Sequence, residues 1–350
     1  MNNKMLHVFN YMWLGGVPCF IRNMMQVYPQ FHHVCAYLNS SLNMGDGVPR
    51  GEDFDMLQEW ENVFGADCGF IYDGILRKSL IDEIDPAIVV LQGISGNRLE
   101  GEWPYQWLRE RPTMFIHHMN SRPHLQVDFD VFVSNSLFQK YQDTKDRMRK
   151  WVICPPVIDT SVLASIPRPR PSDGTVVIGK LCSDWNAKKY PKFMLDMFRK
   201  LNEEYPGKLK FVVVGADKHW SNHGIPNLET PPVKSRSIVD FLKSMDIMLY
   251  MNDDLPETWG RSVTEAMAAG ACIIADDCGG IPEQIENDNH GWLVKTPTEA
   301  MGFLREAIEN RAVAHSMGEA ARERAVAEFG LDRLTRDTAD FMLSALTGGA

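Results

Sequence analysis

Several patterns that mark large classes of protein are missing from this sequence. No two cysteines are separated by just two residues, so neither a zinc ribbon nor a Cys-x-x-Cys redox motif is indicated. No Gly-x-Gly-x-x-Gly motif follows an expected strand, which counts against a nicotinamide-dependent dehydrogenase. What is present is an ordinary globular composition, in which 44% of the 350 residues are hydrophobic and 23% are charged.

A basic surface is lacking as well. The formal net charge is −10, and basic residues outnumber acidic ones in neither half of the chain. Because non-specific nucleic-acid binding depends on positive charge, the balance disfavours a nucleic acid as partner or substrate.

Long apolar runs are equally scarce. The run from Met5 to Phe20 is interrupted by His7 and Asn10, is too short to span a bilayer, and lacks a small-residue cleavage pattern. The seven cysteines are odd in number, and several lie within apolar runs, as buried thiols do. These features predict a cytoplasmic protein with at most peripheral membrane contact.

The most informative stretch extends from Pro256 to Gly270. It contains good helix formers, Glu265–Ala269, and ends at a glycine that favours helix termination. A helix that begins at Gly260 or Arg261 directs the amides of its first turn toward the preceding loop. These amides and the helix dipole both favour an anion, so the stretch predicts a phosphate site made by Arg261, Ser262 and Val263.

Two carboxylates bracket this predicted helix end. Glu257 precedes it, and Glu265 lies about one turn inside the helix. A phosphate flanked by hydroxyl-rich groups, as in a nucleotide sugar, suits this arrangement. The alternative is a surface helix with two ordinary acidic residues.

The residues that follow favour the first interpretation. Ala271–Ala275 predicts a buried strand, and Gly279–Glu283 predicts a glycine turn that restarts a helix. The block from Pro256 to Val294 resembles the signature of the family 4 retaining glycosyltransferases, in which a Glu, seven further residues and a second Glu are followed by a small-residue helix, an apolar strand and Gly-Gly-x-Pro-Glu. The resemblance is strong from about Val152 to Val294 and loose before that.

The resemblance implies an α/β protein of the GT-B type, in which two Rossmann-like doubly wound domains face each other across a cleft. The length gives room for two such cores. A proline-rich segment, 166–174, is expected to be a stiff linker between them. The expected parts are an acceptor-binding domain (1–165), a nucleotide-sugar-binding domain (174–328), and a last helix (329–350) that packs back on the first domain.

The resemblance also implies roles for individual residues of the second domain. Glu257 is expected to orient the hydroxyls of the donor sugar, and Glu265 those of the ribose. The family holds the donor diphosphate with an arginine and a lysine. This chain has Lys180 in place of the arginine and Lys188 in place of the lysine, and Lys180 is a point charge where arginine is a bidentate fork. The other expected donor contacts are Trp259, Gly260, Arg261, Ser262 and Val263.

Fewer residues of the first domain carry over. The glycine loop after the first strand matches the family through Gly15 and Gly16, which are expected to lie against the donor phosphate and the acceptor. His118 is the better match for a histidine near the donor sugar, with His117 as the adjacent alternative. Because neighbouring residues of a strand point to opposite faces, this pair does not predict a metal site, and no other is evident.

The reaction implied is transfer of a sugar from a nucleoside-diphosphate sugar, UDP or GDP, with retention at the anomeric carbon by front-face transfer. Neither a cofactor nor a metal ion is expected, and the acceptor is a glycan, a lipid-linked molecule or a small molecule. Two alternatives stay open: another reaction on the same scaffold, by a phosphorylase or a sugar-nucleotide epimerase, and a degenerate transferase that serves as a binding or scaffold module.

Overall fold

The chain forms two compact units. The structure, a computed structural model, describes residues 3–10, 16–38, 51–71, 74–94, 99–101, 106–118, 127–143, 148–164, 174–182, 186–233 and 237–347. Unit 1 comprises Met1–Val157 together with Leu331–Ala350, and unit 2 comprises Ile158–Gly330. The chain therefore returns to unit 1 for its last helix, while the expected linker 166–174 lies almost wholly outside the described residues.

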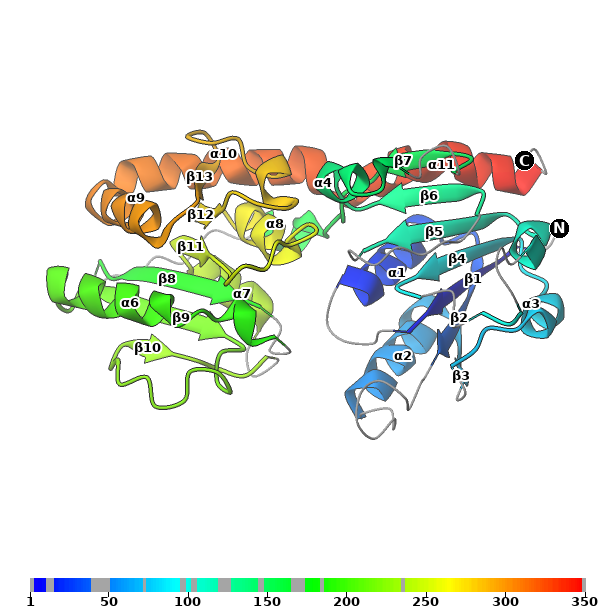
Figure 1. The fold of residues 1–350 in the computed structure, drawn as a ribbon, viewed down its shortest axis with the longest axis horizontal. Helices are drawn as coiled ribbons and strands as arrows, with labels where there is room; N and C mark the ends of the chain where they lie inside the picture. The colour runs from blue at the N-terminus through cyan, green and yellow to red at the C-terminus, as the bar shows by residue number, and fades with distance from the viewer. Residues whose placement is uncertain are drawn as a thin grey trace. The chain divides into compact units, whose positions relative to one another are not determined.

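Unit 1 is built on a parallel sheet whose described strands follow the order β3-β2-β1-β4-β5-β6-β7 (Figure 1). Short apolar runs form these strands, and all residues of β4 and β5 are buried, as expected of a sheet covered on both faces. The strands are β1 (Lys4–Phe9), β2 (His32–Leu38), β3 (Asp67–Ile71), β4 (Ile88–Gln92), β5 (Thr113–His117), β6 (Phe129–Phe132) and β7 (Trp151–Ile153).

Helices cover this sheet. Ser134 caps α4, since its hydroxyl accepts the Leu137 amide hydrogen at 3.1 Å. The last helix, α11, packs within unit 1, where the Phe341 ring stacks on Phe129 with centroids 4.8 Å apart. The described helices are α1 (Gly16–Val27), α2 (Gly51–Phe64), α3 (Lys78–Ile84), the 3₁₀ helix η2 (Gln106–Glu110), α4 (Asn135–Gln139) and α11 (Leu331–Thr347).

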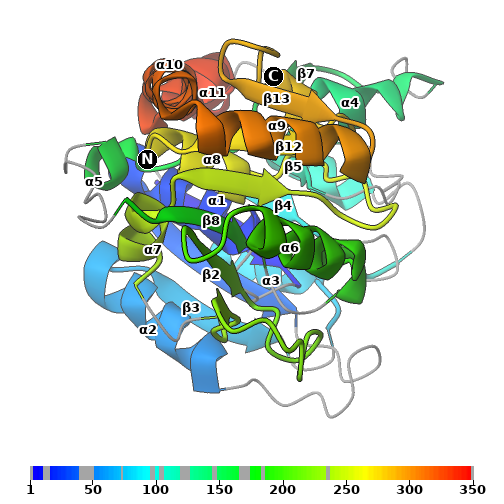
Figure 2. The ribbon, with the colours of Figure 1, turned by 90° about the vertical axis from the view of Figure 1, so that its left-hand side faces the viewer.

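Unit 2 repeats the design with a second parallel sheet, whose described strands follow the order β10-β9-β8-β11-β12-β13. Figure 2 shows α6 and α9 side by side in front of this sheet. The strands are β8 (Val176–Leu181), β9 (Leu209–Val214), β10 (Leu228–Glu229), β11 (Ile247–Tyr250), β12 (Cys272–Asp276) and β13 (Gly291–Val294). The described helices are α5 (Thr160–Ala164), η4 (Ala187–Lys189), α6 (Phe193–Glu204), α7 (Ile238–Ser244), α8 (Arg261–Ala268), η5 (Ile281–Glu283), α9 (Pro297–Glu309) and α10 (Arg311–Phe329).

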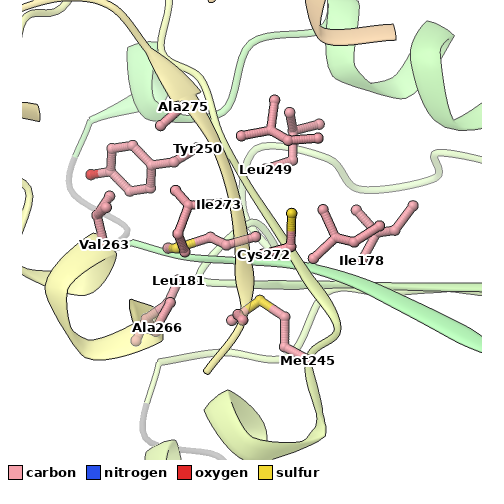
Figure 3. Packing of buried hydrophobic residues seen from close by; sticks show 14 of the residues in the cluster. Ile178, Leu181, Met245, Leu249, Tyr250, Val263, Ala266, Cys272, Ile273 and Ala275 are labelled. Atoms are coloured by element: carbon pink, nitrogen blue, oxygen red, sulfur yellow. The ribbon is translucent and has the colours of Figure 1, made fainter. Parts of the chain in front are cut away.

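Helix α8 is held by the apolar core of unit 2. Figure 3 shows Val263 and Ala266 of α8 beside Tyr250 and Ile273 of the neighbouring strands, and all four are at most 2% exposed. The helix ends two residues before Gly270, whose φ of 78° suits a glycine. The predicted helix therefore forms, and its inner face fixes it on the sheet. The predicted restart after Gly279 is only the 3₁₀ turn η5.

The strand order places a topological switch point in each sheet. In unit 1 the chain runs outward in opposite directions from β1 and β4, and in unit 2 from β8 and β11. Ligands of open α/β sheets bind at the carboxyl ends of the strands beside such a point. Lys180 is next to last in β8, and Glu257 follows β11, so this edge of unit 2 is where the predicted residues of that unit gather.

Candidate functional site

The amino end of α8 begins at Gly260, whose φ of 84° lies in the left-handed region. Gly260, as the N-cap residue, has no side chain that could cap this end. The Val263 amide already donates to the Gly260 carbonyl at 2.8 Å, and its side chain is completely buried. Of the three amides predicted to form an anion site, those of Arg261, Ser262 and Val263, the Val263 amide is thus bonded within the first turn.

Glu257, just before this helix end, is held by two donors. Its Oε1 accepts hydrogen bonds from the Lys189 ammonium at 2.7 Å and from the Tyr250 hydroxyl at 2.9 Å. The side chains of Lys189 and Glu257 are 11% and 16% exposed, so the ion pair is mostly shielded from water. Burial favours a lower pKa for Lys189, but the Glu257 carboxylate outweighs it, and the pKa rises above the ordinary lysine value. Lys189 therefore keeps its charge at neutral pH.

Glu265 faces Arg261 on the same helix. The Arg261 guanidinium lies 2.8 Å from Oε1 of Glu265, one turn further along α8, and the Glu265 side chain is 14% exposed. A carboxylate in this position accepts hydrogen bonds from hydroxyl groups once the arginine moves aside or shares it. One predicted glutamate, Glu257, thus precedes α8 and the other, Glu265, lies one turn inside it, and each is paired with one cation.

The cation beside Glu257 is Lys189, not Lys188. Both belong to η4, in which the Asn186 side chain accepts the Lys188 amide hydrogen at 2.9 Å. Successive residues of a 3₁₀ helix point about 120° apart, so one lysine of the pair turns inward and the other outward. Lys189 is buried and reaches Glu257, whereas Lys188 is exposed. In the sequence, the signal for this cation was a pair of adjacent lysines. Only the direction in which η4 turns each side chain decides that Lys189 is the one that reaches Glu257.

Lys180, which was predicted to hold the donor diphosphate, is fully buried. Its ammonium donates to the carbonyl oxygens of Lys189 and Met251, and to Oδ1 of Asn252 at 3.2 Å. These three bonds use all three ammonium hydrogens. Burial lowers the pKa of Lys180, and nearby acidic groups oppose that change. In this conformation Lys180 has no hydrogen left for a phosphate.

Trp259 is also a structural residue. Its indole Nε1 donates to the Thr264 hydroxyl at 3.0 Å, its ring packs edge-on against Phe329, and it is 3% exposed. Its carbonyl accepts from the Gln284 side chain. The side chain of Trp259, which was predicted as a donor contact, lies in the core and anchors the start of α8.

Two glycines brace the segment that carries Glu257. The Gly280 amide donates to the Glu257 carbonyl at 2.9 Å. A Cβ at Gly279 would collide with the Glu257 carbonyl, and one at Gly280 would collide with the Thr258 carbonyl. The predicted glycine turn is thus a place where two backbones touch, and it fixes the position of Glu257.

In unit 1, the two adjacent histidines separate as strand geometry requires. His117 is buried and its Nε2 lies 2.8 Å from Oδ1 of Asp130. His118 is half-buried at the end of β5, with Nε2 3.0 Å from Oε1 of Gln92 and its ring edge-on to Phe20. Burial lowers the pKa of His118 to about 3, so the ring is neutral at physiological pH.

Gln92 is a residue that sequence reasoning missed. It is completely buried at the end of β4, beside the switch point, and among the described residues its Nε2 has no hydrogen-bond partner. A polar residue at the end of an otherwise apolar strand was the available signal. Tyr250, the last residue of β11, and Lys189, the neighbour of Lys188, were also missed.

Other predicted features fall at the margin of the described structure. Gly15 lies outside the described residues, and Gly16 is described only as the first residue of α1. Within the described residues, no group of three or more His, Cys, Asp or Glu is placed to hold a metal ion. No helix in that part of the chain combines the length and apolarity needed to cross a membrane.

The chain is similar to several known proteins. Residues 182–324, which contain Lys189, Glu257 and Glu265, match the family model of the glycosyl transferases group 1. These residues form most of unit 2. Trehalose synthase of Pyrococcus horikoshii is 28% identical over 148 residues, or 37% of this chain and 35% of that protein. D-inositol 3-phosphate glycosyltransferase of Streptomyces avermitilis is 29% identical over 118 residues, or 33% of this chain and 25% of that protein.

Each of these two alignments covers about a third of this chain. The alignments span about a third of the length of the trehalose synthases. Solved structures cover the whole chain at low identity. Anabaena HepE in complex with UDP-glucose has a TM-score of 0.72 at 12% identity and covers 97% of this chain and 99% of its own. A glycosyltransferase from Rickettsia africae has a TM-score of 0.76 at 15% identity and covers 99% of both chains. The chain has the GT-B fold, and both the predicted fold class and the resemblance to glycosyltransferases are confirmed.

Proposed function

We propose that this protein transfers a sugar from a nucleoside-diphosphate sugar, UDP or GDP, to an acceptor, with retention at the anomeric carbon. The observation that carries the proposal is the helix end at Gly260, with Glu257 and Glu265 on either side and the Lys189 ammonium beside Glu257. This set lies within the segment that matches the group 1 model. Structural neighbours that were solved with UDP or UDP-glucose support the choice of donor.

In the proposed donor complex, the amides of Arg261 and Ser262 and the positive end of α8 bind the diphosphate. Glu265 accepts hydrogen bonds from the ribose hydroxyls, which requires Arg261 to share or release it. Glu257, oriented by Tyr250, accepts from hydroxyls of the donor sugar. Lys189 lies beside Glu257, where its charge stabilises the negative charge that develops on the departing phosphate.

The proposed step is a front-face transfer. The bond from the anomeric carbon to the phosphate oxygen breaks, and a bond from that carbon to the acceptor oxygen forms on the same face. The departing phosphate takes the acceptor's proton, so the step needs no protein nucleophile and no separate base. Because water competes with the acceptor, the reaction depends on excluding water from the sugar.

We assign acceptor recognition to unit 1. Its sheet carries Gln92 and His118, the latter expected near the donor sugar, at the carboxyl ends of two neighbouring strands beside a switch point, where ligands of open α/β sheets bind. A neutral His118 suits a hydroxyl better than a phosphate. The acceptor is proposed to be a glycan, a lipid-linked molecule or a small molecule. The seven cysteines are all free thiols, which supports a reducing, cytoplasmic location.

Two alanine variants test the donor site. Glu265→Ala is expected to weaken UDP or GDP binding by about tenfold or more, since a carboxylate hydrogen bond contributes roughly 1.5–3 kcal/mol. Glu257→Ala is expected to change nucleotide affinity little and to lower turnover strongly. Glu203→Ala, at an exposed position of α6, is the control. Titrations in which all three variants bind both nucleotides like the parent would refute the assignment.

Product analysis tests the reaction itself. A panel of UDP- and GDP-sugars is screened for thermal stabilisation, because a bound ligand raises apparent stability. With the nucleotide sugar that stabilises the protein, NMR of the product is expected to show that the transferred sugar keeps the donor's anomeric configuration. Sugar phosphate formed with added phosphate would instead indicate a phosphorylase, and an isomerised sugar nucleotide without acceptor would indicate an epimerase.

A further inference from the structure

Lys180 occupies an unusual place for a lysine. It is the next-to-last residue of β8, it is completely buried, and its ammonium lies at the switch point of the unit 2 sheet. Buried lysines are rare, and they persist when all their hydrogens are bonded. Here the acceptors are two backbone carbonyls and one side-chain oxygen from two different segments.

The two segments are those that carry the candidate site. One is η4, where Lys180 binds the carbonyl of Lys189. The other follows β11, where it binds the Met251 carbonyl and the Asn252 side chain, a few residues before Glu257. The ammonium also lies 5.1 Å from the centroid of the Tyr250 ring, whose hydroxyl donates to Glu257. Lys180 thus contacts the segment that carries Lys189 and the segment that leads to Glu257, but it bonds to neither charged group of the ion pair.

A second interaction fixes Asn252 from the opposite direction. Its backbone amide donates to Oδ2 of Asp276 at the end of β12, at 2.7 Å. Three neighbouring strands, β8, β11 and β12, are thereby joined at their carboxyl ends by one polar network. A satisfied buried network of this kind is rigid, because each lost bond leaves an unpaired polar group.

We propose that Lys180 is a positioning residue, which holds the backbones at Lys189 and Met251 so that Lys189 and Glu257 meet, and which does not itself bind the diphosphate. This inference rests on the proposed function for the identity of the ligand. It places the cationic contact with phosphate on Lys189 and gives Lys180 an indirect effect that acts through Lys189.

A double-mutant cycle separates an indirect effect from a direct contact. UDP and GDP are titrated calorimetrically into the parent, Lys180→Met, Lys189→Met and the double variant. Lys189→Met is expected to weaken binding by about tenfold or more, and Lys180→Met by about three- to tenfold. If Lys180 acts through Lys189, the double variant binds within about twofold of Lys189→Met alone. Losses that multiply in the double variant overturn the proposal.

Lys243 provides a matched control. It is 3% exposed and its ammonium donates to the Val162 carbonyl at 2.8 Å, so Lys243→Met also deletes a buried ammonium that binds a carbonyl. Lys243→Met is expected to lower the melting temperature while nucleotide affinity stays within about twofold of the parent. If it weakens nucleotide binding as much as Lys180→Met does, the effect is general destabilisation and the proposal fails.

Chemical labelling provides a readout that needs neither activity nor a folded Lys180 variant. The folded parent is treated briefly with acetic anhydride, and acetylated lysines are identified by mass spectrometry. Lys188 is expected to react and Lys180 to stay unmodified, and saturating UDP is expected to lower labelling at Lys189 alone among the three. Acetylation of Lys180 at the rate of Lys188 overturns the proposal. Where Lys180→Met folds, Lys189 is expected to label several-fold faster than in the parent, and an unchanged rate also overturns it.

The two proposals fail in different ways. If the parent binds neither UDP, GDP nor inorganic pyrophosphate, the proposed function fails. The labelling of Lys189 in Lys180→Met still decides, in that case, whether Lys180 positions its neighbour.

Discussion

The Lys189 ammonium and the Glu257 carboxylate lie 2.7 Å apart, although the two residues come from different loops of unit 2. Lys189 ends η4, and Glu257 precedes α8, so the contact joins the segments after β8 and β11. Because Tyr250 donates to the same carboxylate oxygen, the pair has a defined geometry before any ligand binds. Such preorganisation lowers the cost of arranging charges during a reaction.

Breaking this pair from one side is expected to destabilise the protein. Lys189→Met leaves Glu257 mostly buried without its cation, and the free energy of unfolding is expected to fall by about 2 kcal/mol, less than for a fully buried pair. The pKa of Lys189 is raised by Glu257 against the effect of burial, so the contact contributes fully below the ordinary lysine value and is lost as pH rises above it. Urea titrations of parent and variant at pH 8 and pH 11 check this. A difference that does not shrink at the higher pH contradicts it.

The close approach of Gly280 to the Glu257 segment predicts a second variant. Gly280→Ala forces a methyl group against the Thr258 carbonyl, so the segment must shift, at a cost of about 1–3 kcal/mol. Turnover is expected to fall by more than tenfold because Glu257 moves with it. Gly302→Ala is the control, since that glycine lies in α9 with open space around it, and alanine there is expected to stabilise by about 0.5–1 kcal/mol. Equal thermal shifts and full activity in both variants contradict the prediction.

The neutral His118 predicts a dependence of stability on acid. Its pKa is lowered by burial to about 3, below that of an unfolded chain, so the unfolded state binds the proton more readily between pH 6.5 and 3. Stability from burying this ring is therefore complete above about pH 6.5 and is lost as pH falls through that window. Between pH 7 and 4.5 the parent is expected to lose roughly 1–2 kcal/mol more than His118→Asn, as measured by urea unfolding. Parallel losses in the two proteins contradict this.

The carboxyl group of Asp276 predicts a pH dependence of stability opposite in sign to that predicted from His118. Burial raises its pKa to about 6, and the bond from the Asn252 amide only partly opposes that effect. The folded state therefore binds the proton more readily between about pH 4 and 6, and the parent loses stability as pH rises through this range. Asp276→Asn is expected to match the parent near pH 4 and to exceed it by about 1–2 kcal/mol at pH 8, in chemical denaturation at both pH values. A variant that is less stable than the parent at pH 8 contradicts this.

Local patterns in the sequence predicted the elements of the site well. Gly260, the good helix formers after it and Gly270 specify α8 nearly to the residue, because helix starts and stops depend on a few neighbouring residues. The buried strands β11 and β12 follow from short apolar runs in the same way. Of the two predicted glutamates, Glu257 precedes this helix and Glu265 lies one turn inside it.

Directions of side chains were predicted less well. The sequence does not distinguish Lys188 from Lys189, because their spacing from every other motif differs by one residue, and only the phase of η4 turns one inward. Lys180 and Trp259 stand at positions that suit ligand binding, yet both are buried and bonded to the protein itself. The sequence around a lysine does not show whether its ammonium will donate hydrogen bonds to carbonyls that are distant in the sequence.

The sequence by itself determined the helix that begins after Gly260, because helix starts and stops depend on short-range preferences, and it indicated the class of fold through its resemblance to a known family. Only the tertiary structure decided that Lys189 reaches Glu257 and that the ammonium of Lys180 is bonded to backbone carbonyls. The reason is physical: the partners of Lys180 and Lys189 come from segments separated by up to 72 residues, and their meeting depends on how three strands end at one edge of a sheet.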